Sequence, residues 1–289
     1  MSSSVPSPIL VTGATGKQGG AVLEALQTLP NPPKLRALSR NPDSPAAQKL
    51  KEKGVEVFKG DLSDSEGLKK ALEGAEAAFL VTTIAPKGSS EEEQGINFIR
   101  VAQSTNLSYL VFTSVCDATP TCTVPHFESK ARIEEELRQS GMNHAVVAPA
   151  CFMDNFPAQS GVALSMLTGV FDASLNGKEI QMISVKDIGE VSAKVVADPS
   201  TYAGKVIKLA GDCLTMADVT DIYARLENKS VWKAWIPSLA VSVLPYDFKM
   251  MLRWFDSTGF SADIPALRKE FPGLRTFEQY LREAKEEAQ

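Results

Sequence analysis

The sequence is poor in residues that bind metals or form disulfides, with four cysteines and two histidines among 289 residues. The cysteines lie far apart and form no C-x-x-C pair, so we expect neither a metal site nor a disulfide framework. Free thiols of this kind suit a reducing, cytoplasmic compartment. The longest apolar runs fall far short of the roughly 18–20 residues that cross a bilayer, and the first residues lack the basic and apolar regions of a secretory signal.

An excess of positive charge is also absent. Thirty basic residues stand against 35 acidic ones, which gives a net charge of −5 and a pI of about 5.3. A chain of this charge does not concentrate nucleic acid or an anionic membrane around itself, so neither is an expected partner. With 44% hydrophobic and 22% charged residues, the composition is that of a globular protein that buries its own core.

What the chain does have, up to Pro149, is a regular alternation of short β-branched runs and longer amphipathic runs. Strands separated by helices in this way form βαβ units, which build a parallel, doubly wound sheet with right-handed crossovers. We therefore expect an α/β fold with a Rossmann-type sheet. The expected strands are Ile9–Thr12, Lys34–Ser39, Val55–Lys59, Ala77–Thr83, Ser108–Ser114 and Ala145–Ala148, and the expected helices lie near 17–29, 43–53, 64–73, 91–105 and 128–141.

The alternation stops after Pro149, where glycines and prolines break up the following segments. We expect a Rossmann domain over residues 1–150 and a smaller, irregular α+β domain over residues 151–289, from which segments can return to the first sheet. In this second part, the apolar runs Ile183–Gly189 and Val206–Leu209 are interpreted as strands.

Two further stretches of the second part have a recognisable pattern. Thr215–Glu227 begins with Thr-x-x-Asp, a variant of the capping box, and is expected to be an amphipathic helix. Val231–Phe260 is rich in aromatic residues, which are expected to pack into a core rather than line a substrate pocket.

A glycine-rich turn, T-G-A-T-G-K-Q-G-G over residues 12–20, follows the first expected strand directly and precedes a helical run. In its G-x-x-G-x-x-G spacing, Gly13 permits a tight turn, Gly16 lets backbone N–H groups approach a pyrophosphate, and Gly19 lets the helix pack close to the sheet. The phosphates then lie at the positive N-terminus of the helix. The turn is therefore expected to bind a dinucleotide, with further contacts from Thr15, Lys17 and Gln18.

The second expected strand ends in Ser39-Arg40-Asn41, where an NAD-selective site places an acid on the ribose 2′-hydroxyl. Arg40 stands there instead and can pair with a 2′-phosphate, and Lys17 can add a second charge. The alternative is that both are solvated surface cations. NADP(H) is thus the expected cofactor rather than NAD(H).

Later strand ends supply more candidate contacts for the cofactor, because ligands meet parallel sheets at the carboxyl ends of their strands. The candidates are Asp61 and Leu62 after the third strand, Thr82 and Thr83 after the fourth, and Cys151 and Phe152 after the sixth. We do not expect Cys151 to be a nucleophile, because neither histidine lies near it in the sequence.

With these residues, the sequence resembles the NmrA-like branch of the atypical short-chain dehydrogenase/reductase superfamily. The resemblance extends over nearly the whole chain. It is carried by the glycine turn at 12–20, Ser39-Arg40-Asn41, Gly60-Asp61-Leu62, the helix with His126 and Lys130, Pro149–Phe156, Val185–Gly189, Phe271-Pro272 and Thr276–Glu278. It implies an NADP(H)-binding Rossmann domain and a smaller C-terminal domain that closes a cleft over the nicotinamide.

The resemblance also implies where catalysis occurs. Related dehydrogenases usually carry Tyr-x-x-x-Lys, in which the phenol transfers the proton, and here His126 stands at the tyrosine position. His126 and Lys130 share one helix face, so Lys130 can hold the nicotinamide ribose or donate a proton, while His126 either transfers a proton or only packs. Ser114 stands where the superfamily's catalytic serine binds a substrate oxygen, or it satisfies backbone groups.

Two functions are open at this point. One is an NADPH-dependent oxidoreductase that reduces a small aromatic, quinone-like or conjugated carbonyl substrate. The other is a non-catalytic NADP(H) redox sensor that regulates a protein partner. The missing tyrosine favours the sensor, whereas the aromatic C-terminal half favours the enzyme, which is the function we expect.

Overall fold

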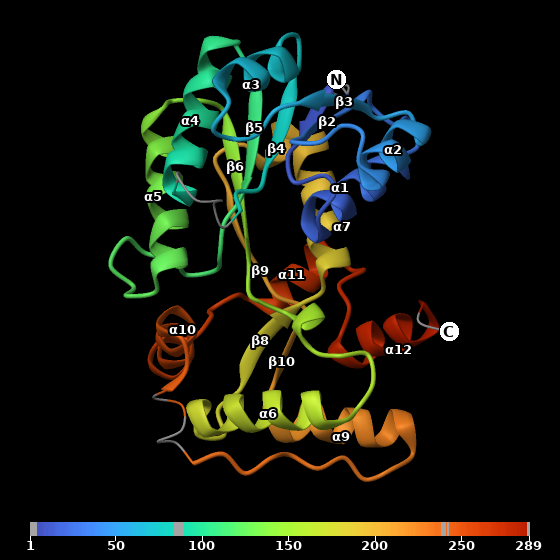
Figure 1. The fold of residues 1–289 in the computed structure, drawn as a ribbon, viewed down its shortest axis with the longest axis vertical. Helices are drawn as coiled ribbons and strands as arrows, with labels where there is room; N and C mark the ends of the chain where they lie inside the picture. The colour runs from blue at the N-terminus through green and yellow to red at the C-terminus, as the bar shows by residue number, and fades with distance from the viewer. Residues whose placement is uncertain (1–4, 84–89, 238–240, 242, 288–289) are drawn as a thin grey trace.

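The structure is a computed structural model that describes residues 5–83, 90–237, 241 and 243–287. Its larger layer is a parallel sheet of seven strands in the order β3-β2-β1-β4-β5-β6-β9 (Figure 1). These strands are β1 Ile9–Val11, β2 Leu35–Ser39, β3 Glu56–Lys59, β4 Ala77–Leu80, β5 Tyr109–Thr113, β6 His144–Pro149 and β9 Val206–Leu209.

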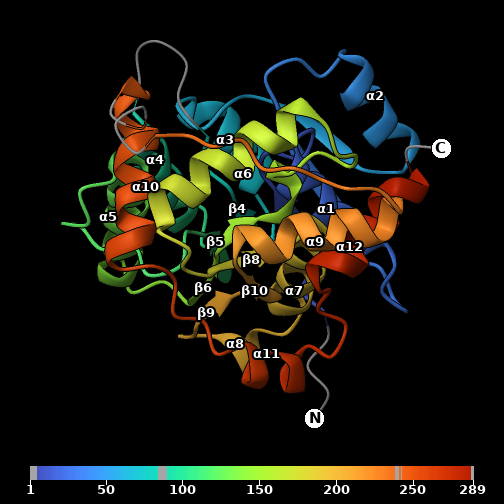
Figure 2. The ribbon, with the colours of Figure 1, turned by 90° about the horizontal axis from the view of Figure 1, so that it is seen from below.

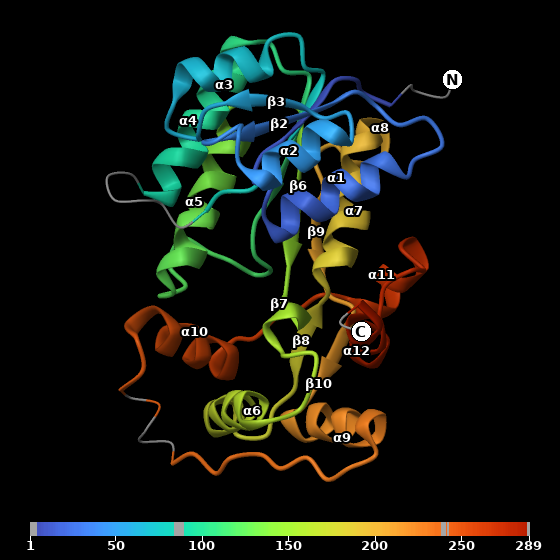
Figure 3. The same cartoon turned by 45° about the vertical axis from the view of Figure 1, so that its right-hand side comes forward.

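Helices cover both faces of this sheet (Figure 3). One face packs against α1 Lys17–Gln27, α2 Pro45–Glu52, α7 Val185–Ala197 and α8 Pro199–Tyr202, and the other against α3 Ser65–Leu72, α4 Glu91–Ser104 and α5 Pro125–Gln139. Successive residues of a strand point to opposite faces, so Ile9 and Val11 enter one core cluster and Leu10 enters the other. Burial on both faces explains why the strands are almost continuously apolar.

A smaller sheet lies beyond the carboxyl end of β6, with the remaining helices around it (Figure 1). Its strands are β7 Cys151–Phe152, which pairs in parallel with β8 Ile180–Ile183, and β10 Asp212–Leu214, which is antiparallel to β8. The helices of this part are the 3₁₀ turn η1 Met153–Asn155, α6 Val162–Leu175, α9 Met216–Glu227, α10 Tyr246–Ser257, α11 Ile264–Glu270 and α12 Phe277–Glu287. The predicted fold class, a Rossmann-type α/β sheet with a smaller α+β part, is confirmed.

The expected strand at Ile183–Gly189 is wrong, because β8 ends at Ile183 and a helix, α7, begins at Val185. The side-chain oxygen of Ser184 accepts the backbone N–H of Asp187 at 3.0 Å and so caps this helix. The apolar residues that suggested a strand continue along α7 with helical spacing. The expected strand Val206–Leu209 is present as β9, which returns to the large sheet beside β6.

The helix expected to begin at Thr215 is also present, with a capping box between Thr215 and Asp218. The aromatic stretch after it forms the expected core only in part. Trp254 and Phe255 are buried, but Trp232 and Trp235 are 60% and 85% exposed.

Packing of the segment before α10 explains this exposure. The N–H of Ala234 donates to the carbonyl oxygen of Ser165 on α6, and the carbonyl oxygen of Ala234 lies 2.3 Å from where a Cβ on Gly169 would stand. The backbone of the segment therefore lies against α6 at Ala234, and the side chains of Trp232 and Trp235 remain in solvent. Figure 2 shows this segment running across α6 and α9.

Candidate functional site

The glycine-rich turn joins β1 to α1, and its glycines are required by the local geometry. Gly13 has a φ of +59°, a conformation that residues with a Cβ seldom adopt, and its carbonyl oxygen accepts the N–H of Gly16 at 2.8 Å. A Cβ on Gly19 would stand 2.4 Å from the Gly13 carbonyl oxygen, so only glycine lets α1 start this close to β1. No side chain caps the N-terminus of α1 by a hydrogen bond, which fits pyrophosphate binding at its backbone N–H groups.

A cleft of about 560 Å³ opens at this turn and runs along the carboxyl ends of β1 to β4. Twelve of the cofactor contacts predicted from the sequence line it: Gly13, Thr15, Gly16, Lys17, Gln18, Gly19, Arg40, Asp61, Leu62, Thr82, Thr83 and Phe152. Its further lining residues were not predicted: Thr12, Leu38, Ser39, Asn41, Ser44, Gly60, Ser63, Val81 and Gln94. The cleft is long and polar at the strand ends, which fits an extended dinucleotide.

The basic end of the cleft lies after β2. Arg40 is exposed there, and Ser44 caps α2 by accepting the N–H of Ala47. Lys17, the first residue of α1, donates from Nζ to the backbone carbonyl of Asp154 at 3.5 Å. The Ser44-Pro45 pair is a helix-start signal in the sequence. The sequence therefore already indicated that a helix begins at Ser44, beside the basic end of the cleft.

At the other end of the cleft, Lys130 lies one hydrogen bond behind the lining. Its Nζ is 2.9 Å from Glu91 Oε1 and donates to Thr82 Oγ1 at 3.2 Å. The Thr82 hydroxyl donates in turn to Glu91 at 2.7 Å. Among the described residues, Thr82 lines the cleft and Lys130 does not, so the two form a short path from the cleft to α5.

His126 is the second residue of α5 and is half-buried, edge-on to the ring of Phe127. Burial lowers the pKa of His126, and the opposing attraction of Glu91 and Asp247 does not compensate. The imidazole is therefore neutral at neutral pH and holds no extra proton to donate.

The structure separates Ser114 from the lining of the cleft. Ser114 is buried at the end of β5, and its hydroxyl donates to the carboxyl of Glu134 on α5. Burial raises the pKa of Glu134, and the hydrogen bond from Ser114 and the nearby cations offset only part of that rise. Glu134 was not predicted, because nothing local in the sequence signals a pairing across twenty residues.

Cys151 is buried in β7 and is likewise not among the described residues that line the cleft, although its neighbour Phe152 is. Burial raises the pKa of its thiol to about 12, against a weak hydrogen bond from Asn155. The thiol is protonated at neutral pH, which agrees with the prediction that it is not a nucleophile.

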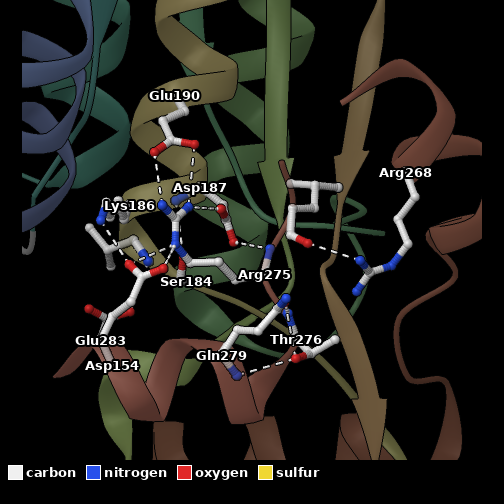
Figure 4. Close-up of polar contacts among 12 residues, drawn as sticks. Asp154, Ser184, Lys186, Asp187, Glu190, Arg268, Arg275, Thr276, Gln279 and Glu283 are labelled. Atoms are coloured by element: carbon white, nitrogen blue, oxygen red, sulfur yellow. Dashed lines mark hydrogen bonds and ion pairs between the residues drawn. The ribbon is translucent and has the colours of Figure 1, made fainter. Parts of the chain in front are cut away.

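Figure 4 shows a polar cluster that fixes the start of α7 next to the glycine turn. The carboxylate of Asp154 accepts the N–H of Val185 at 2.8 Å, and the backbone oxygen of the same residue accepts Lys17. Asp187, whose side chain is fully buried, pairs with Arg275, which also reaches Glu190 and Glu283 at 3.1 and 2.9 Å.

The helix that this cluster holds packs very closely on α1. A Cβ on Gly189 would stand 2.6 Å from Ala21, so glycine is needed where α7 crosses the helix of the glycine turn. The sequence resemblance pointed to the Val185–Gly189 segment, and the structure gives its physical role. The segment follows β8, which pairs with β7, the strand that carries Phe152 of the cleft lining.

In the part of the chain that the structure describes, no three His, Cys, Asp or Glu residues are grouped to hold a metal ion. Within the same residues, no helix is long and apolar enough to cross a membrane. All four cysteines are free.

The proteins to which this chain is similar include reductases and a transcriptional regulator. It is 28% identical over 222 residues to quinone oxidoreductase 2 of Escherichia coli strain K12, covering 77% of this chain and 74% of that protein. The Citrobacter triphenylmethane reductase solved with NADP(H) superposes with a TM-score of 0.79 at 19% identity, over 96% of this chain and 99% of that one.

A second structure is NmrA, a negative transcriptional regulator solved with NADP, which superposes with a TM-score of 0.75 at 19% identity, over 96% and 95% of the two chains. At this identity the two structures support the fold alone. The dinucleotide in both is the one expected here from Arg40. The model of the NmrA-like family matches residues 6–281, and the chain therefore belongs to the NmrA-like family.

Proposed function

We propose that this protein is an NADPH-dependent oxidoreductase that reduces a small aromatic, quinone-like or conjugated carbonyl substrate. The observation that carries the proposal is the cleft itself. The cleft contains a glycine turn that fits a pyrophosphate. Arg40 forms its basic end, and Thr82, which is bonded to Lys130, lies at its far end. Residues 151–289 then act mainly as the substrate domain, with Phe152 facing the cleft.

The residues at the basic end favour NADP(H) over NAD(H). Arg40 follows β2 where an acid would hold a free 2′-hydroxyl, and it is exposed and available to a 2′-phosphate. Lys17 lies on the same cleft but already bonds the Asp154 carbonyl, so its contribution to the phosphates is smaller.

The residues at the far end fit a reduction. NADPH, when bound, supplies a hydride, and the reduced substrate needs a proton to balance the charge. Lys130 carries an ammonium that donates to Thr82 at the cleft, whereas burial keeps His126 neutral. We assign two roles to Lys130, donation of the proton to the substrate and binding of the nicotinamide ribose. We assign only a packing role to His126. Because Ser114 donates its hydroxyl proton to Glu134, it can donate to a substrate oxygen only if that bond breaks.

The second candidate is a redox sensor that binds NADP(H) and regulates a protein partner. One observation favours it, which is that the residue at the usual tyrosine position is a neutral, half-buried imidazole. In either function the free cysteines suit a cytoplasmic protein.

NADPH oxidation by the purified protein distinguishes the two functions. We expect absorbance at 340 nm to fall when quinones, enones, aromatic ketones or triphenylmethane dyes are added, faster with NADPH than with NADH. The control is the Lys130→Met variant under the same conditions. Tight NADPH binding without oxidation across the whole panel would contradict the enzyme and favour the sensor.

A further inference from the structure

Three consecutive glutamates begin α4, and one of them points away from solvent. Glu92 pairs with Arg132 at 3.1 Å, and Glu93 closes a capping box with Ser90. The side chain of Glu91, in contrast, is only 11% exposed. Acidic residues are favourable in the first turn of any helix, but that preference does not explain why one of the three is turned inward.

The buried carboxylate of Glu91 joins three elements of the fold. It lies 2.9 Å from the ammonium of Lys130 on α5, accepts the Thr82 hydroxyl after β4 at 2.7 Å, and accepts the Ser129 hydroxyl on α5 at 2.6 Å. Burial by itself raises the pKa of Glu91, but the charge of Lys130 and these hydrogen bonds outweigh it and leave the pKa below its usual value. Glu91 is therefore ionised at neutral pH.

The same contacts restrict Lys130. Its ammonium carries three N–H groups, and among the described residues two of them have acceptors, on Glu91 and on Thr82. The ammonium also lies 5.8 Å from the ring centre of Phe112, which limits its movement on the other side. A flexible lysine side chain is thus held in one place, beside the Thr82 hydroxyl that lines the cleft.

We propose that Glu91 is a positioning residue, which holds the Lys130 ammonium beside Thr82 at the far end of the cleft. Without the carboxylate, Lys130 would lose the partner that fixes its orientation. Glu91 touches neither cofactor nor substrate in this account and acts only through Lys130. The proposal rests on the proposed function, because it gives a residue outside the cleft a role in the same reaction.

Glu91→Gln tests the proposal, with Glu92→Gln as the matched control from the same helix turn. We expect Glu91→Gln to lower kcat for NADPH oxidation about tenfold, which is part of the ~10²–10⁴-fold that general acid–base help supplies, while KM for the substrate changes less than twofold. Glu92→Gln is expected to match the unmodified protein in both measurements.

A merely structural role for Glu91 would lower the thermal midpoint without lowering kcat at an unchanged KM. Glu91→Asp keeps the charge and serves where Glu91→Gln does not fold, and we expect it to recover part of the kcat that Glu91→Gln loses. An unchanged kcat in Glu91→Gln would overturn the proposal.

A binding measurement tests the role of Glu91 even if the protein is not an oxidoreductase. If the unmodified protein oxidises no substrate, the NADPH dissociation constant from calorimetry replaces kcat. We then expect Glu91→Gln to weaken NADPH binding at least threefold, and to add no further loss in a Lys130→Met background. Equal losses in both backgrounds would show that Glu91 does not act through Lys130.

Discussion

The ion pair between Arg275 and Asp187 gives the sharpest prediction about stability, because its two partners differ so much from ordinary surface charges. The Asp187 side chain is fully buried and that of Arg275 is 13% exposed. Asp187 accepts both the backbone N–H and the guanidinium of Arg275, which joins the segment before α12 to the first turn of α7 (Figure 4).

Replacing Arg275 by methionine leaves a buried carboxylate without its cation. Breaking such a pair from one side costs about 3–5 kcal/mol, whereas the contacts of Arg275 with Glu190 and Glu283, each more than a third exposed, contribute less than about 1 kcal/mol. For a chain of this size, we expect the thermal midpoint to fall by about 10 °C. Arg282→Met is the control, since Arg282 is 60% exposed and pairs only with Glu278 among the described residues.

The dependence on pH checks the mechanism. Burial raises the pKa of Asp187 even in the presence of Arg275, and removing Arg275 raises it further. A carboxyl whose folded pKa lies above its unfolded value loses stability as the pH rises, so the deficit of Arg275→Met should be smaller at pH 5 than at pH 7.

Thermal unfolding followed by circular dichroism measures these differences. Adding Asp187→Asn to Arg275→Met should recover part of the loss, because the amide needs no cation. The reasoning is refuted if Arg275→Met costs no more than Arg282→Met, or if the deficit is independent of pH and of Asp187→Asn.

Three further predictions concern the cleft. Arg40→Ala should remove most of a preference of at least tenfold for NADPH over NADH, since a charge-assisted pair contributes about 1.5–3 kcal/mol, and equal affinities in the unmodified protein by calorimetry would contradict the assignment. Gly16→Val should abolish dinucleotide binding with an unchanged circular dichroism spectrum, because Gly16 has a φ of −99° that valine can adopt and the new side chain would occupy the pyrophosphate site. Loss of the fold together with binding would mean that the turn is only structural. Lys130→Met should lower turnover by about 10²–10⁴-fold in steady-state NADPH oxidation, and His126→Phe by much less, whereas the reverse order would make the imidazole the acid.

The first half of the fold was predictable because its signals are local. The strand and helix alternation, the glycine turn and the residue after β2 each depend on neighbours a few positions apart. Gly13, Gly16, Gly19 and Arg40 line the cleft as expected. The prediction of a strand at Ile183–Gly189 was wrong because the end of β8 and the capped start of α7 follow one another directly. Together they form one short apolar run that resembles a strand.

The contacts that tune the site were not predictable, because they join residues far apart in the sequence. Glu91 looks like one of three solvated acids at a helix start, and only the packing of α4 on α5 turns it towards Lys130. Ser114 was predicted from its place at a strand end, but its partner Glu134 depends on how α5 lies against β5.

Whether a chain with this cleft is an enzyme or a sensor depends on which group near its far end can deliver a proton at neutral pH. Burial keeps His126 neutral and the Cys151 thiol tightly protonated, and Ser114 is bonded to Glu134. Of the groups predicted to act there, Lys130 is the one that combines a positive charge with a hydrogen bond to the cleft lining. A chain that kept the glycine turn and Arg40 but lost the Glu91–Lys130 pair would still bind the dinucleotide and would lack a proton for the product. The retained pair is therefore our reason for choosing the enzyme over the sensor.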